Sequence, residues 1–248
     1  MFFNYGGGVN RNVIYGLLII LAIMSLASMG VGGWINLLLT LPAVIMAITF
    51  HEYAHAYAAD KLGDTTPRAQ GRLTLNPTSH LDFFGFILMM FTHIGWGKPV
   101  QINPNNFNSN KSRGFCETMV SLAGPLMNFI LAIIATVAFY ALNIFAAGFL
   151  HTNIEYIIEM FLQVVIMVNI GLGTFNLIPL PPLDGEKIFR HLLPYRVQEW
   201  LTNNYATLYY VFMILWIFGI LEIVVSPVIS VISNMLFKGV GAVFSLFI

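Results

Sequence analysis

Long intervals without a charged residue dominate the pattern of hydrophobic and polar positions along the chain. The longest are residues 12–51, 118–154, 160–183 and 200–221. A helix that crosses the hydrocarbon core of a bilayer needs roughly 20 apolar residues, so the first interval has room for two helices separated by Gly30–Gly33. We therefore predict about six transmembrane helices, near residues 13–30, 34–58, 118–148, 156–178, 204–225 and 226–247.

One apolar run does not fit this series of spans. Phe83–Trp96 is shorter than the roughly 17–25 residues that a span requires. Before it, Gly71–Leu75 alternates weakly between polar and apolar residues and ends at Asn76-Pro77, which is typical of a short strand followed by a turn. The expected fold class is an all-α membrane protein with a membrane-associated re-entrant or β-hairpin-like segment between helices 2 and 3.

The composition supports a single membrane domain. Of 248 residues, 58% are hydrophobic and only 9% are charged, against about 25% charged residues in a soluble domain. Eleven Lys and Arg balance eleven Asp and Glu, so there is no net basic field to attract nucleic acid. The single cysteine, Cys116, excludes an internal disulfide. We expect residues 1–248 to form one polytopic domain in contact with the lipid bilayer.

The basic residues segregate if residues 83–96 do not cross the membrane. All Lys and Arg residues except Lys238 then fall on one side of the bilayer. Because cytoplasmic loops carry an excess of Lys and Arg, we predict that this side is cytosolic. The chain is then a multi-pass protein of the cell membrane with both termini in the cytosol.

Candidate chemistry lies near the end of the second predicted helix. His51-Glu52-Tyr53-Ala54-His55 places two histidines four residues apart, on one helix face, with a glutamate beside them. This spacing suits zinc, with Glu52 as a general base toward water. The alternative is a solvated helix end ahead of Lys61, but ionisable residues inside a membrane helix are costly and favour a functional interpretation.

A catalytic zinc site needs a third protein ligand and an open position. Asp60 lies five residues past His55 and off the ligand face of the helix, whereas Asp82 is compatible by spacing alone. The other candidate, Asp184, lies in Asn176–Gly185, where three prolines interrupt a helix near membrane depth. Irregular backbone at that depth must line a cavity or be buried in protein. Asp184 also has an alternative interpretation as the N-cap of a following helix.

The predicted topology tests the pairing of these residues. With six crossings, the second helix ends in the cytosol, and the third and fourth carry the chain out and back. His55 and Asp184 then reach the same leaflet. If residues 83–96 crossed the membrane, the two side chains would lie on opposite leaflets and could not share a metal.

Five segments spread over nearly the whole chain carry a family resemblance. They are Phe50–His55, Asn76-Pro77 with His80 and Asp82, Gly95–Val100, Ala123-Gly124-Pro125 with Asn128, and Asn176–Gly185. Together they resemble the motifs of the site-2 proteases, which are intramembrane zinc metalloproteases, in their compact bacterial branch without PDZ or CBS domains. Phe83 departs from the family pattern, in which proline commonly follows the aspartate that matches Asp82.

The resemblance implies that His51, His55 and Asp184 bind zinc and that Glu52 activates water. The implied reaction is hydrolysis of peptide bonds in membrane-spanning or membrane-anchored proteins near the cytosolic side. It also makes Asn128 and Asn176 candidates for positioning the substrate. The alternatives are a catalytically inactive membrane scaffold, which the intact residue set disfavours, and a transporter, for which paired repeats would be expected.

Overall fold

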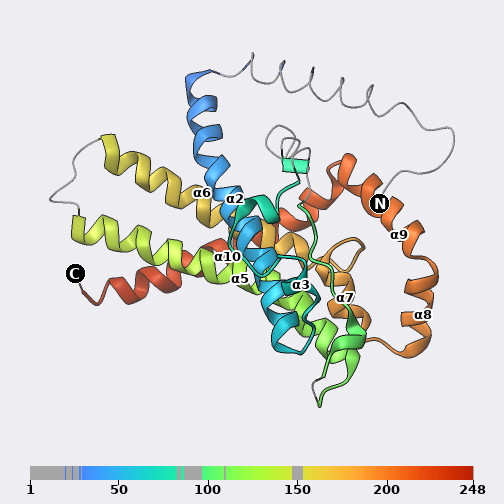
Figure 1. Ribbon diagram of the computed structural model, residues 1–248. Helices are drawn as coiled ribbons and strands as arrows, with labels where there is room; N and C mark the ends of the chain where they lie inside the picture. Colours follow the sequence, from blue (N-terminus) through green and yellow to red (C-terminus); the bar gives the residue numbers. More distant parts are fainter. Residues whose placement is uncertain are drawn as a thin grey trace.

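The computed structural model describes residues 20, 24, 28, 30–82, 85, 86, 97–108, 110–146 and 153–247 (Figure 1). Its helices are α2 (Val31–Lys61), α3 (Thr66–Ala69), η1 (Pro77–Ser79), η2 (Pro104–Asn106), α5 (Arg113–Ala141), η3 (Leu142–Ala146), α6 (Asn153–Asn176), α7 (Asp184–Arg190), α8 (Tyr195–Asn203), α9 (Tyr205–Ile217) and α10 (Ile220–Phe244). No strand occurs among these described residues, whose β structure is limited to an isolated bridge. The predicted all-α class is confirmed.

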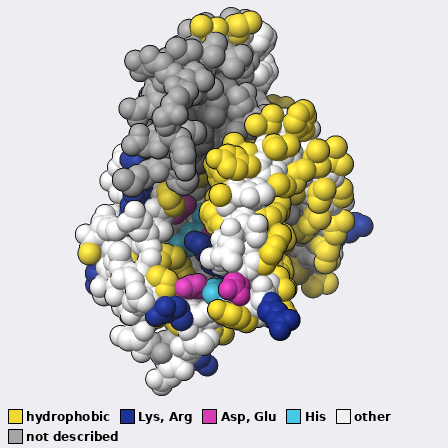
Figure 2. Space-filling model, turned by 90° about the vertical axis from the view of Figure 1, so that its right-hand side faces the viewer, with side chains coloured by type: hydrophobic (Ala, Val, Ile, Leu, Met, Phe, Trp, Pro, Cys, Tyr) yellow, Lys and Arg dark blue, Asp and Glu magenta, His cyan; other side chains and the backbone are white. Residues whose placement is uncertain are grey.

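Within the described part of the chain, four helices are long and apolar enough to cross a membrane. They are α2, α5 together with the π-helical turn η3, α6, and α10. Their outer faces expose large apolar side chains, which gather over one side of the molecule in Figure 2, as expected of a surface that contacts lipid. The helix predicted near residues 13–30 lies almost wholly outside the described residues.

The end of the chain divides differently from the prediction. We expected one helix at 204–225 and another at 226–247, but α9 ends at Ile217 and α10 begins at Ile220. Gly219 between them has a φ of 69°, a left-handed conformation that glycine adopts without strain. The 13 residues of α9 are too few to cross a bilayer alone. The predicted boundary was wrong because the helix breaks at this glycine, whereas α10 continues without a break through Pro227.

The core of the fold is a bundle of α2, α5 and α6, with α10 packed against α5 and α6 (Figure 1). Small side chains at the contact let the helices approach closely, as is common in membranes. At Gly173 of α6, a Cβ would lie 3.2 Å from the Phe129 ring and from the Pro125 carbonyl oxygen. The buried core residues are Ala43, Ala132, Ala135, Val165, Ile166 and Ile170.

The connection from α2 to α5 leaves and returns at one place. Leu81 and Gly97 form an antiparallel bridge, and the Lys98 amide donates to the His80 carbonyl at 2.7 Å. The described residues on either side of 83–96 therefore lie next to each other, which supports the prediction that this segment does not cross the membrane. Apart from residues 85 and 86, the segment 83–96 lies outside the described residues.

The short strand predicted at residues 71–75 is wrong. These residues form a turn followed by bends. Gly71 has a φ of 68°, which is incompatible with an extended strand. The Arg72 guanidinium donates to the Ser79 carbonyl, so the segment folds back on its own neighbours.

Asp64 ties this connection to the end of α2. Its side chain is fully buried and accepts hydrogen bonds from Thr66, from the Asn103 amide and from the Asn106 side chain. Burial raises the pKa of the carboxyl, but these hydrogen bonds to the charged form outweigh it and hold the pKa of Asp64 below its usual range. The carboxylate therefore joins residues 64–66 to residues 103–106.

Candidate metal centre

His51 and His55 project from the same face of α2. They are only 5% and 6% exposed. Their rings meet edge to face with centroids 4.6 Å apart, and their Nε2 atoms are 3.0 Å apart. The four-residue spacing thus brings both imidazoles to one point, as helical geometry predicts.

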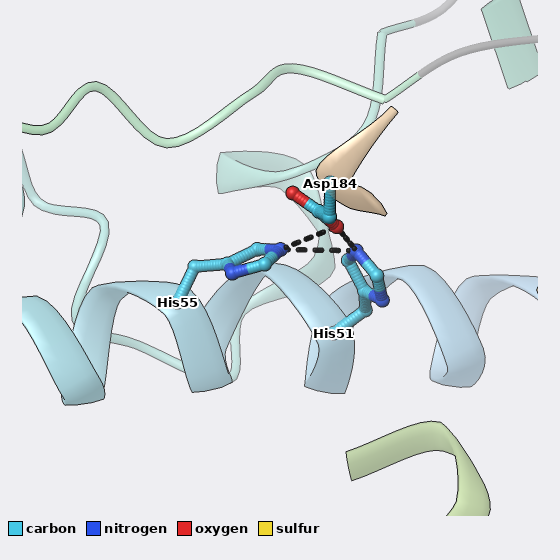
Figure 3. A group of neighbouring side chains, drawn as sticks. All are labelled: His51, His55 and Asp184. Carbon is cyan, nitrogen blue, oxygen red and sulfur yellow. Dashed lines mark hydrogen bonds and ion pairs between the residues drawn. The ribbon is translucent and has the colours of Figure 1, made fainter. Parts of the chain in front are cut away.

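Asp184 completes the group from a segment far along the chain. It is the first residue of α7, and its Oδ2 lies 3.1 Å from the Nε2 atoms of both His51 and His55 (Figure 3). Ligand atoms of the three side chains all lie within 4.8 Å of one another. Among the described residues, these three are the His, Cys, Asp or Glu side chains that are arranged to hold a metal ion. We call them the metal group.

The interpretation of Asp184 as an N-cap is wrong. Leu183 occupies the N-cap position of α7, where all residues are described, and no side chain caps the first turn. The Asp184 carboxylate points instead toward the two histidines, as Figure 3 shows. Its side chain is 15% exposed, so the group is mostly buried but reaches the surface.

The segment between α6 and α7 aims this carboxylate. Three prolines at 179, 181 and 182 prevent α6 from continuing, because each removes a backbone donor. At Gly185, a Cβ would fall 2.4 Å from the carbonyl oxygens of Leu177 and Ile178. Only glycine therefore lets α7 begin directly against the end of α6, which places Asp184 over α2.

The Nδ1 atoms of both histidines face hydrogen-bond acceptors. His55 Nδ1 donates to the Val120 carbonyl at 2.7 Å, and His51 Nδ1 donates to Asn128 Oδ1 at 2.6 Å. In a neutral ring whose Nδ1 carries the proton, Nε2 presents a lone pair. Two lone pairs and a carboxylate oxygen therefore point at one spot, and this arrangement is repulsive unless a cation lies between them.

The donor set fits zinc. Histidine nitrogen and carboxylate oxygen bind zinc at about 2.0–2.2 Å, and a tetrahedral ion at that distance separates its ligands by roughly 3.3 Å. The observed separations of 3.0 and 3.1 Å are close to this value. Three protein ligands leave a fourth position open, as in catalytic rather than structural zinc sites.

Helix α5 passes directly against the two imidazoles. A Cβ on Gly124 would fall 2.4 Å from His55 Nε2 and 2.7 Å from His51 Cε1. No side chain fits in that space, so glycine is required at this position. α5 continues as a helix through the adjacent Pro125.

Glu52 lies beside the group without belonging to it. Its Oε2 accepts a hydrogen bond from the Val100 amide at 3.0 Å, and a Cβ on Gly97 would lie 3.9 Å from its Oε1. Residues 97–100 therefore run along the carboxylate. A carboxylate next to a metal group but outside it has the placement that a general base needs.

The other residues singled out by sequence occupy different surroundings. Asn128 is fully buried beside His51. Asn176 ends α6, and its side chain donates to the Leu172 carbonyl within that helix. Asp82, which spacing left open as a ligand, accepts a hydrogen bond from the Gly85 amide and does not join the group.

Sequence reasoning missed two groups that support the histidines, the Val120 carbonyl directly and Asn169 through Asn128. Asn169 of α6 is fully buried and accepts a hydrogen bond from Asn128 at 2.9 Å. A lone asparagine inside an apolar helix was the available signal, because a buried amide needs partners. The Val120 carbonyl carries no such signal, since every residue supplies a carbonyl.

Comparison with known proteins defines the class. The profile of Peptidase family M50 matches residues 39–156 and 141–220. The "Putative zinc metalloprotease YwhC" of Bacillus subtilis is 36% identical over 201 residues, which cover 81% of this chain and 90% of that protein. The "Putative zinc metalloprotease Rip2" of Mycolicibacterium smegmatis is 30% identical over 159 residues, which cover 60% of this chain and 54% of that protein. No solved structure matches.

The fold, the metal group and these matches agree on a zinc-dependent metalloprotease embedded in a membrane. The chain belongs to Peptidase family M50, the site-2 protease family. The resemblance drawn from the sequence motifs is therefore confirmed, and so is zinc as the cofactor.

Proposed function

We propose that the protein is an intramembrane protease that hydrolyses peptide bonds of membrane-spanning or membrane-anchored proteins near the cytosolic side. His51, His55 and Asp184 hold the zinc ion, and Glu52 is the general base. The observation that carries the proposal is the convergence of two histidine nitrogens and one carboxylate oxygen beside a membrane-length helix bundle.

The depth of the group supports cleavage close to one membrane surface. His55 precedes Lys61, the last residue of α2, by six positions, or about 9 Å along a helix. Basic residues follow at Arg68 and Arg113, and such residues favour the cytosolic side. The scissile bond then lies inside the bilayer but within reach of cytosolic water.

The chain's own residues account for the steps of hydrolysis. Zinc at this site supplies Lewis acidity, which polarises a carbonyl and lowers the pKa of a water molecule. His51 and His55 keep their Nε2 lone pairs available because their Nδ1 protons are engaged. Glu52 accepts the proton of the attacking water and passes it to the leaving amine as the C–N bond breaks.

The reaction also requires an extended substrate. A carbonyl inside a helix is already hydrogen-bonded, so the substrate must unwind near the scissile bond. Residues 97–100 form irregular chain beside Glu52, and we place the extended substrate next to them. Backbone pairing with an added strand is a common way to hold such a peptide.

Reconstitution in liposomes tests the proposal. A set of single-span model substrates should be cut near the cytosolic end of the span, and cleavage should stop on zinc removal and return on zinc addition. The His51→Ala/His55→Ala double variant should hold no zinc. Stoichiometric zinc in that double variant, or cleavage that survives zinc removal, would refute the assignment.

A further inference from the structure

A chain of buried amides extends from His51 across the bundle. Asn128 Nδ2 donates to Asn169 Oδ1 at 2.9 Å and to the Ala47 carbonyl at 3.1 Å. Asn169 Nδ2 in turn donates to the Val165 carbonyl at 2.9 Å. Both asparagines are fully buried. The chain thus connects α6, α5 and α2, and it ends on a residue of the metal group.

The orientation of both amides is fixed at the end of this hydrogen-bonded series that lies farthest from His51. The Val165 carbonyl can only accept a hydrogen bond, so the NH₂ group of Asn169 faces it and Oδ1 faces Asn128. The Ala47 carbonyl imposes the same choice on Asn128, whose Oδ1 is left facing His51. Turning either amide over would set like groups against each other in a dry interior, where unpaired polar atoms are costly.

The two histidines differ in what holds them. His55 Nδ1 donates to a backbone carbonyl, and a side-chain substitution at Val120 would not remove this acceptor. His51 Nδ1 donates to a side-chain amide, whose orientation depends on its own partner in α6. The tautomer of His51 therefore depends on residues that do not touch it.

We propose that Asn169 is a positioning residue of the zinc site, which acts through Asn128 to keep the proton of His51 on Nδ1 and its Nε2 lone pair toward the ion. The inference rests on the proposed function, because it takes His51 as a zinc ligand. Hydrogen bonds of this kind orient ligating histidines and raise metal affinity.

The same contacts bear on the role of Asn128. Its Oδ1 faces His51, and its NH₂ group donates to both Ala47 and Asn169. An amide has two N–H groups, so none is left for a substrate. These contacts favour a role toward His51 over the substrate contact expected from the sequence.

A double-mutant cycle tests the inference by zinc affinity, measured by chelator competition on the full chain in detergent. Asn128→Leu should weaken zinc binding by about 10–100-fold, the effect typical of losing a partner of a ligating histidine. Asn169→Leu should weaken it by about 10-fold, since Asn128 keeps Ala47 as one partner. The double variant should bind no more weakly than Asn128→Leu alone, because the two residues act in series.

Three further variants control this cycle. Thr136→Val removes another buried hydrogen bond, from Thr136 Oγ1 to the Ala132 carbonyl, and should leave zinc affinity unchanged. Asn169→Asp, which this dry interior keeps in the protonated form, retains an oxygen toward Asn128 and an O–H donor toward the Val165 carbonyl, and should keep near wild-type affinity. Asn169→Ala repeats the truncation without apolar bulk if the leucine variant does not fold.

Two outcomes overturn the inference alone. One is an Asn169→Leu or Asn169→Ala protein with the same zinc affinity as Thr136→Val, and the other is a double variant whose losses add. A wild-type protein that binds no zinc would instead overturn the proposed function, and the inference with it.

Discussion

Gly124 and His55 set how closely α5 approaches α2. A Cβ on Gly124 would fall 2.4 Å from His55 Nε2, so the imidazole occupies the space that any larger residue would need. The two imidazoles of α2 therefore fit against α5 because α5 has no side chain at this position.

Gly124→Ala should abolish zinc binding while the protein remains folded. The added methyl group and the imidazole cannot share this space, so His55 must turn away and lose its hydrogen bond to Val120. Zinc per protein, measured by elemental analysis, should fall to background. Gly171→Ala in α6 is the matched control, since its Cβ would meet only Ile229 Cδ1 at 4.0 Å. Full zinc content in Gly124→Ala would contradict the close packing described above.

Glu52→Gln should separate metal binding from catalysis. The substitution keeps the shape of the side chain but removes the base, so zinc content should be normal while cleavage falls by about 10²–10⁴-fold or more. Asp60→Asn changes another carboxylate of α2, one that pairs with Arg68 away from the metal group, and should cleave normally. Wild-type rates from zinc-loaded Glu52→Gln protein would exclude Glu52 as the base.

Asp184→Asn should lose zinc and activity almost as completely as Asp184→Ala. Asparagine has nearly the same size and shape as aspartate but is a poor neutral substitute for a carboxylate on zinc. Zinc content and cleavage are compared in both variants, together with thermal unfolding to show that the fold is kept. Normal zinc content in Asp184→Asn would remove this residue from the ligand set.

Asp64→Asn should destabilise the protein by roughly 1–3 kcal/mol, because an amide cannot accept all the hydrogen bonds that the buried carboxylate accepts. The folded-state pKa of Asp64 is below its usual range, so its contribution is fully present above the unfolded value of about 3.9. That contribution is lost as the pH falls through the depressed folded-state pKa. Denaturation at pH 7 and at stepwise lower pH should show the gap between wild type and variant closing. A gap independent of pH would argue against a charged Asp64.

Cysteine labelling checks the membrane topology. In a background in which the buried Cys116 is replaced by alanine, Ala69→Cys and Asn110→Cys should both react from the cytosolic side, since both positions are exposed. Thr152→Cys should react from the outside. Labelling of residues 69 and 110 from opposite sides would make residues 83–96 a membrane span.

Much of the metal group could be predicted from the sequence, because it consists of side chains and two of them lie at helical spacing. His51 and His55 follow from the four-residue repeat. The topology that the basic residues predict brings Asp184 to the same leaflet, and the family resemblance implies that it is the third ligand. Val120 and Val100 could not be foreseen, because they contribute a backbone carbonyl and a backbone amide. Such groups are present at every position, and only the packing of two helices and a loop selects them.

Two errors in the predicted fold share a physical cause. Gly219 separates α9 from α10, and Gly71 breaks the strand expected at 71–75, each with a φ near +70°. Glycine adopts positive and negative φ about equally well, so its presence alone does not reveal a break. In Gly124 and Gly185, by contrast, glycine is needed for space, and their φ values are ordinary.

The spacing of the α5 contacts has a consequence for sequence length. Val120, Gly124 and Asn128 meet the two histidines at intervals of four residues, matching the interval between His51 and His55. One residue inserted between Val120 and Asn128 would turn one of these contacts by about 100° around the helix, and a slip of one turn would shift all of them by about 5.4 Å. The geometry of the metal group thus depends on the register of α5 against α2. Substitutions on the lipid-facing side of α5 leave that register alone, whereas any insertion or deletion along this stretch dismantles the site.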